Sequence, residues 1–159
     1  MKKLIIAALV GGGAISTWIA QAASTSGTFN VNVTLNSTCS LSAINAVAFT
    51  YTSFQGSAAN STGGGFSVSC TNSLPYTFGL QAGNGTASPP GAATITVTDD
   101  AVSLQYTLGT SAAGGTGNGA AQAYSVTGTM AAGQSGTCAS ASCTNASASN
   151  KTQTLILNF

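Results

Sequence analysis

The chain has 159 residues, of which only 3% are charged: three are Lys or Arg, two are Asp or Glu, and none is His. So few charges exclude electrostatic binding of nucleic acid or anionic lipid, and an apolar content of 43% excludes a disordered chain of the usual hydrophilic, charged kind. Without His, and with Asp99 and Asp100 as its only carboxylate side chains, the sequence offers no group to activate a serine, so we expect no enzyme.

The N-terminal residues 1–22 have the form of an export signal. Two lysines precede an apolar stretch at 4–19, and residues 20–22 form an A-x-A cleavage site. The alternative is a transmembrane helix, but the stretch is shorter than the roughly 20 apolar residues that a span needs, and glycines interrupt it. We therefore predict a signal peptide at 1–22 and an exported chain of one domain, which keeps Lys151 as its only cationic side chain.

The remaining sequence alternates apolar and polar residues in one segment after another. Successive side chains of a strand point to opposite faces, so each such segment predicts a strand with one apolar face. The first lies at 28–36 and has Phe29, Val31, Val33 and Leu35 on its apolar face. Further segments follow at 47–51, 66–70, 74–80, 95–97, 102–108, 124–130 and 155–159, the last with Leu155, Leu157 and Phe159 on one face.

Gly-, Ser- and Asn-rich segments at 56–65, 83–92, 109–121 and 131–150 separate the predicted strands and are expected to be loops. Seven or eight short strands at this spacing predict an all-β sandwich.

Four cysteines in an exported domain predict two disulfides. The sequence allows three pairings, of which we prefer Cys39–Cys70 with Cys138–Cys143. On a loop-entropy estimate the first would stabilise the fold by about 4 kcal/mol and the second by about 2 kcal/mol. The C-x4-C spacing of the second pair, with no His in the chain, disfavours a metal or redox site, so we expect no metal and no cofactor.

The three charged side chains outside the predicted signal have simple interpretations. Asp99 and Asp100 lie between two predicted strands and are expected to form a hairpin turn, since a cation site needs more oxygen ligands. Lys151 is expected to be a solvated charge that guards the apolar last strand. The alternative for Lys151 is an isopeptide bond to an Asn, as in some surface pilins.

The order of several motifs along the chain carries a family resemblance. A G-x-F-x-V-x-V segment at 27–33 precedes Cys39, and a G-x-x-V-x-C strand at 65–70 is followed by a P-Y-x-x-x-L strand at 75–80. An L-x-Y segment at 104–106 and an alternating C-terminal strand at 154–159 complete the pattern. With this order the chain resembles the spore coat protein U domain family, which includes subunits of archaic chaperone–usher pili.

The resemblance implies an incomplete immunoglobulin-like sandwich, in which a missing strand leaves a groove into the core. The N-terminal extension of a neighbouring subunit would fill this groove, after a periplasmic chaperone has filled it first and an outer-membrane usher has exchanged the two. Residues 23–38 would be the donor segment, with Phe29, Val31, Val33 and Leu35 entering the groove, and residues 39–159 the pilin domain. The paired cysteines of the family match Cys39 and Cys70. The alternative is that 28–36 is the first strand of the chain's own sandwich.

The function implied is that of a structural pilus subunit at the cell surface, for adhesion and biofilm formation. Its partners would be copies of itself or sister pilins, with no nucleic acid. The alternatives are a carbohydrate-binding or tip adhesin domain, or a coat or matrix protein that forms no pilus. Two features depart from the family pattern: the loop 131–150 with its second cysteine pair, and the very low charge.

Overall fold

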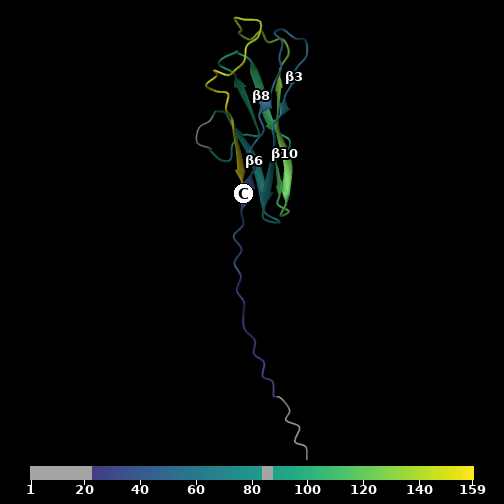
Figure 1. Cartoon of the computed structure of the whole chain (residues 1–159), viewed down its shortest axis with the longest axis vertical. Coiled ribbons are helices and arrows are strands. Elements are labelled where there is room, and N and C mark those ends of the chain that lie inside the picture. The colour runs from purple at the N-terminus through teal and green to yellow at the C-terminus, as the bar shows by residue number, and fades with distance from the viewer. Residues whose placement is uncertain (1–22, 84–87) are drawn as a thin grey trace, which may run out of the picture. The chain divides into compact units, whose positions relative to one another are not determined.

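The structure is a computed structural model that describes residues 23–83 and 88–159 (Figure 1). Within these residues it contains strands, turns and irregular segments but no helix, and its strands pair in antiparallel fashion. The predicted all-β class is therefore confirmed. The predicted signal peptide at 1–22 lies outside the described residues. In the part of the chain that the structure describes, no helix is long and apolar enough to cross a membrane.

The chain divides into two units, residues 1–34 and 35–159, and every described strand belongs to the second. The strands are β1 Cys39–Leu41, β2 Val47–Ala48, β3 Ala59–Asn60, β4 Thr62–Gly63, β5 Gly65–Cys70, β6 Pro75–Gln81, β7 Thr94–Thr98, β8 Gln105–Thr110, β9 Gly114–Thr116, β10 Ala121–Met130 and β11 Thr154–Asn158. The largest sheet has the order β1-β5-β10-β8-β7, with β3 also paired to β10. A second sheet has the order β11-β6-β9, and β2 pairs with β4.

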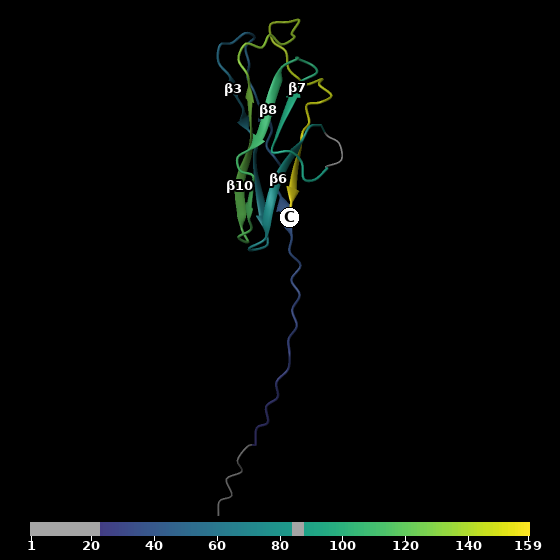
Figure 2. The ribbon, with the colours of Figure 1, turned by 180° about the vertical axis from the view of Figure 1, so that it is seen from behind.

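One hydrophobic core joins the two larger sheets of the 35–159 unit. Along β5 the residues alternate between half-buried and buried, so that Phe66, Val68 and Cys70 face inwards, as the period of two predicts. From the smaller sheet, β6 contributes Tyr76 and Phe78 to the same core, and the rings of Phe66 and Phe78 meet edge to face at 5.3 Å. The result is an incomplete immunoglobulin-like sandwich, in which β6 and β11 lie side by side in both ribbon views (Figures 1 and 2).

The structure contains two disulfides, one between paired strands and one within a loop. Cys39 of β1 lies directly opposite Cys70 of β5, with a Cα–Cα distance of 4.1 Å, so this bond staples the edge strand to the large sheet. The second joins Cys138 to Cys143 within the 131–150 loop.

The C-terminal strand buries side chains on both of its faces. Leu155 and Leu157 pack against the core, whereas Phe159 follows the end of β11 and is 62% exposed. The opposite face carries Ile156, which the alternation assigns to the outside but which is buried. The reason is that the segment around Pro90 crosses this face: a Cβ on Gly79, the partner of Ile156, would lie only 1.9 Å from the Pro90 carbonyl oxygen.

Two predicted loops contain short strands that composition conceals. The 56–65 segment holds β3 and β4, and the 109–121 segment holds β9, which pairs with β6. At Gly115 in β9 a Cβ would lie 2.7 Å from the hydroxyl oxygens of both Tyr76 and Tyr124. Only glycine lets this strand approach the two tyrosines, so the residue that the close approach requires is also one that weakens the sequence signal for a strand.

Candidate functional site

One edge of β11 is unpaired among the described residues, because β11 pairs only with β6. Leu155 lies opposite Leu80, and the Leu80 amide donates away from β11, to the carbonyl of Ala92 at 2.7 Å. Two residues that lie opposite each other in an antiparallel pair either exchange both backbone hydrogen bonds or both point their N–H and C=O groups away from each other. Leu155 and Leu80 are a pair of the second kind, so the N–H and C=O of Leu155 point to the open edge. The same holds for Leu157, because the amide of its partner Phe78 also donates to the far side of β6.

A second open edge belongs to β2, which pairs with β4 and with no other strand of residues 23–83 and 88–159. The segment 44–51, which contains β2, forms one wall of a groove, and residues 151–155, at the start of β11, form part of the other. Two strand edges that each lack a neighbour therefore border the same space. An edge of this kind is a template for pairing with another chain.

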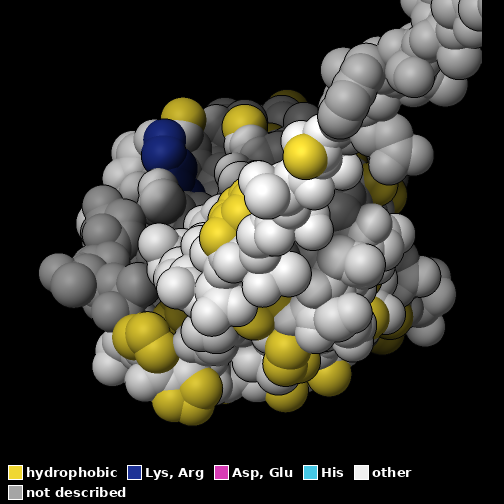
Figure 3. Space-filling model, turned by 90° about the horizontal axis from the view of Figure 1, so that it is seen from below, with side chains coloured by type: hydrophobic (Ala, Val, Ile, Leu, Met, Phe, Trp, Pro, Cys, Tyr) yellow, Lys and Arg dark blue, Asp and Glu magenta, His cyan; other side chains and the backbone are white. Residues whose placement is uncertain are grey.

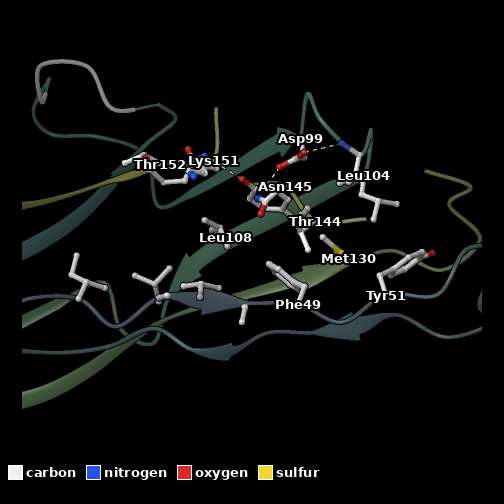
Figure 4. Close-up of a pocket in the computed structure, with 18 of the residues that line it drawn as sticks. Phe49, Tyr51, Asp99, Leu104, Leu108, Met130, Thr144, Asn145, Lys151 and Thr152 are labelled. Carbon is white, nitrogen blue, oxygen red and sulfur yellow. Dashed lines mark hydrogen bonds between the residues drawn. The ribbon is translucent and has the colours of Figure 1, made fainter. Parts of the chain in front are cut away.

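The groove has a volume of about 650 Å³ and an apolar floor. Figure 4 shows Phe49, Leu108 and Met130 projecting into it from different segments of the chain. Phe49 contacts the core through Tyr106, with ring centroids 5.6 Å apart, yet it stays half-exposed because its other side borders the groove. The remaining large apolar residues of the lining are Ile44, Val47, Leu80, Val102, Leu104, Val126 and Leu155.

A buried carboxylate supports the polar rim of the groove. Asp99 is 1% exposed and accepts three hydrogen bonds, from the backbone amides of Ala101 (2.9 Å) and Val102 (3.0 Å) and from the Asn145 side-chain amide (2.9 Å). The first two bonds close the predicted turn between β7 and β8. The third ties the turn to the 131–150 loop, a role that the sequence did not predict because it joins residues 46 positions apart.

Near this carboxylate, Tyr106 also belongs to the groove lining. Burial raises the pKa of the Tyr106 phenol, the hydrogen bond from Gln153 (3.1 Å) lowers it, and the negative charge of Asp99 raises it again. The phenol therefore stays neutral at physiological pH and acts in the groove as a polar group without charge.

Lys151 lies on the rim of the groove beside these groups (Figure 4). Its ammonium group donates to the backbone carbonyl of Ala146 at 2.9 Å. Its predicted role as a solvated charge next to the last strand agrees with its exposure, and its place on the groove rim adds a position that the sequence could not give.

The N-terminal segment is a separate feature of the molecule. Residues 23–38 form neither a helix nor a strand. Phe29 and Val33 are each 85% exposed, Leu35 is 76% exposed and Val31 is 72% exposed. Contiguous exposed apolar surface is uncommon on folded proteins and is often associated with interaction sites.

The family resemblance predicts this segment and the existence of a groove, but the sequence does not identify which residues line the groove. Most groove residues are ordinary alternating strand residues, such as Phe49 and Leu108, whose position beside a missing strand is visible only in the pairing of the sheets.

Comparison with known families agrees with this architecture. The family model of the Spore Coat Protein U domain matches residues 25–155, a stretch that begins within the N-terminal segment and ends in β11. This family includes subunits of archaic chaperone–usher pili. Neither the curated proteins nor the solved structures gave a match to the chain.

Proposed function

The chain belongs to the Spore Coat Protein U domain family, and from this membership we propose that it is a structural pilus subunit whose groove takes up the N-terminal strand of a second subunit. The observation that carries the proposal is the groove itself, with an apolar floor and two unpaired strand edges along its walls. A strand inserted there would satisfy edge hydrogen bonds and place alternate side chains on the floor.

The exposed N-terminal segment has the chemistry that such a groove requires. Its apolar face carries Phe29, Val31, Val33 and Leu35, and its other face carries only neutral polar residues. Full burial of each apolar side chain is worth about 1.5–3 kcal/mol, so the four would contribute roughly 6–12 kcal/mol before the cost of ordering the segment. The absence of a strand at residues 23–38 favours donation to another copy over a first strand of the chain's own sandwich.

The domain organisation and the assembly route follow from the same proposal. Residues 1–22 direct export, residues 23–38 are the donor segment and residues 39–159 are the acceptor domain. An apolar groove with open edges is an aggregation hazard before assembly, so a periplasmic chaperone strand would cover it until an outer-membrane usher exchanges it for a donor. The resulting surface fibre would serve adhesion and biofilm formation.

A pair of charge substitutions on opposite faces of the segment tests the proposal. Val31→Asp places a carboxylate on the apolar face, where burial in a groove is unfavourable, and should abolish fibres seen by electron microscopy of cells that export the full chain. Asn32→Asp adds the same charge one residue away, on the polar face, and should leave fibres in place. Normal fibres from Val31→Asp would show that this face is not the donor surface.

A further inference from the structure

The segment that joins β10 to β11 is held in place more tightly than a connecting loop needs to be. We propose that this loop, residues 131–150 with the Cys138–Cys143 cross-link, is the end wall of the groove and fixes the register of the strand that binds there. The inference rests on the proposed function, because it concerns how the groove selects its occupant.

The loop starts on one wall of the groove and ends on the other. At its start, the Tyr51 hydroxyl donates to the carbonyl of Ala131 (2.9 Å) and accepts from the amide of Gln134 (2.9 Å), and Tyr51 belongs to the 44–51 wall. At its end, the chain continues through residues 151–153 into β11, which borders the opposite wall. The loop therefore runs from one wall of the groove to the other, and three of its residues are part of the lining.

The loop itself contributes to the lining. Cys143, Thr144 and Asn145 border the groove, and Figure 4 shows Thr144 and Asn145 on the side opposite Phe49. These residues are polar or cross-linked, whereas the floor is apolar. This part of the lining therefore presents polar and cross-linked residues to an inserted strand, where the floor presents large apolar side chains.

Anchors along the whole loop keep this wall in position. The amide of Thr137 donates to the Val102 carbonyl at 2.7 Å, and the Asn150 side chain donates to the Thr98 carbonyl at 2.7 Å. Between them, Asn145 binds the buried carboxylate of Asp99, and further along the backbone amide and hydroxyl of Ser149 bind the carboxylate of Asp100. All four anchors are on the β7–β8 hairpin and the strands beside it, so the wall is part of the folded domain.

The second disulfide belongs to the wall and not to the core. Cys138 and Cys143 are exposed, and Cys143 is the first of the three loop residues that line the groove. Their bond closes a short ring directly before Thr144 and Asn145 and limits how far this segment can move away from the groove.

The donor segment meets the requirement that such a wall imposes. On the face that carries its four apolar side chains, the next residues beyond each end are Gly27 and Ser37, so either orientation brings a small residue to the wall and no further large apolar side chain. A strand with an additional apolar pair at the end that meets the wall would have to shift along the groove and lose its match to the floor.

A peptide competition experiment on the full mature chain tests the wall. A synthetic peptide of residues 27–36 is added to the assembling protein, and its inhibition of polymer formation is followed by light scattering. Two further peptides carry an additional Leu-Leu at the amino end or at the carboxyl end. We expect one of the two extended peptides, the one whose added leucines meet the wall, to inhibit the wild-type chain roughly tenfold less well than the short peptide. A tenfold loss corresponds to about 1.4 kcal/mol of binding free energy. The double variant C138S/C143S should accept that peptide again, whereas the loop control Ser147→Ala should behave like the wild type.

Each other outcome overturns a defined part of the argument. If both extended peptides inhibit the wild-type chain as well as the short one does, the loop is no wall, while the proposed function stands. If C138S/C143S responds to the short peptide but still rejects the extended one, the cross-linked segment does not set the register. If the short peptide fails to inhibit the wild-type chain, the proposed function itself is wrong.

Discussion

At the scale of single residues, Asp99 is the one charged side chain that is buried among the residues described. A buried carboxylate is costly unless its oxygens accept hydrogen bonds, and here three donors surround it. Its neighbour Asp100 is exposed and binds Ser149. The two adjacent acids thus attach the same loop at different depths.

Replacing Asp99 by alanine would leave two backbone amides and the Asn145 amide without their acceptor. We expect Asp99→Ala to lower the free energy of unfolding by about 2–4 kcal/mol, measured by denaturant titration. The matched variant Asp100→Ala removes an exposed carboxylate and should cost less than about 1 kcal/mol. Equal losses for the two variants would contradict the assignment of Asp99 as the buried anchor.

Tyr76 gives the protein a dependence on alkaline pH. Burial, together with the 2.6 Å hydrogen bond between its hydroxyl and that of Tyr124, raises the pKa of Tyr76 from 10.0 to about 12. The unfolded chain loses this proton near pH 10 while the folded chain retains it, so the unfolded state binds fewer protons between these values. The stabilisation is complete below pH 10 and is lost as the pH rises towards 12.

The corresponding prediction is that the free energy of unfolding falls less steeply with pH in Tyr76→Phe than in the wild type. Denaturant titrations at about pH 9 and about pH 11 measure the difference. If the free energy of unfolding falls equally with pH in the two proteins, Tyr76 has the same pKa in the folded and unfolded chains.

At the scale of elements, the two disulfides should differ in their effect on stability. The Cys39–Cys70 bond spans 31 residues and links paired strands, whereas Cys138–Cys143 spans only 5. Removing the first with C39S/C70S should cost about 4 kcal/mol and removing the second with C138S/C143S about 2 kcal/mol, because the longer ring restricts the unfolded chain more. Calorimetric unfolding of the monomers would measure both, and a reversed order would contradict the chain-entropy explanation.

Most of the elements could be predicted from the sequence, because their signal is local. The alternation at 66–70 and 74–80 corresponds to β5 and β6 within a residue at each end. The strand β9 could not be predicted, because its glycines serve a close approach to tyrosines that are distant in sequence. A groove is expected from the family resemblance alone; its position and lining could not be predicted, since a missing neighbour is a property of sheet order and has no signature in any single strand.

At the scale of the whole molecule, the near absence of charge is the dominant property. Figure 3 shows hydrophobic side chains in separate patches among uncharged polar ones, with positive charge at a single place. Of the three cationic residues, two belong to the predicted signal peptide, so its removal would leave Lys151 alone. Contacts between subunits must therefore rest on apolar burial and neutral hydrogen bonds.

Assembly should for this reason be almost independent of salt. We expect the rate of polymer formation, followed by light scattering, to change less than roughly twofold between low salt and about 1 M NaCl, where surface charges are screened. The variant Asn32→Lys adds a positive charge to the donor segment, which would repel Lys151 in the proposed complex. Assembly of this variant should therefore be faster at high salt than at low salt. A strong salt dependence of the unaltered chain would reveal ionic contacts that its sequence does not provide.

The position of Lys151 on the groove rim would also allow the free ends of filaments to be counted by chemical labelling. After removal of the predicted signal peptide, an amine-reactive dye would have two targets on the chain, the new amino terminus and this one side chain on the groove rim. A strand lying in the groove would shield the lysine from acylation, whereas a groove at the growing or broken end of a filament would leave it reactive. The fraction of Lys151 that becomes acylated would then report the number of free ends, and so the mean filament length, without any image of the filament.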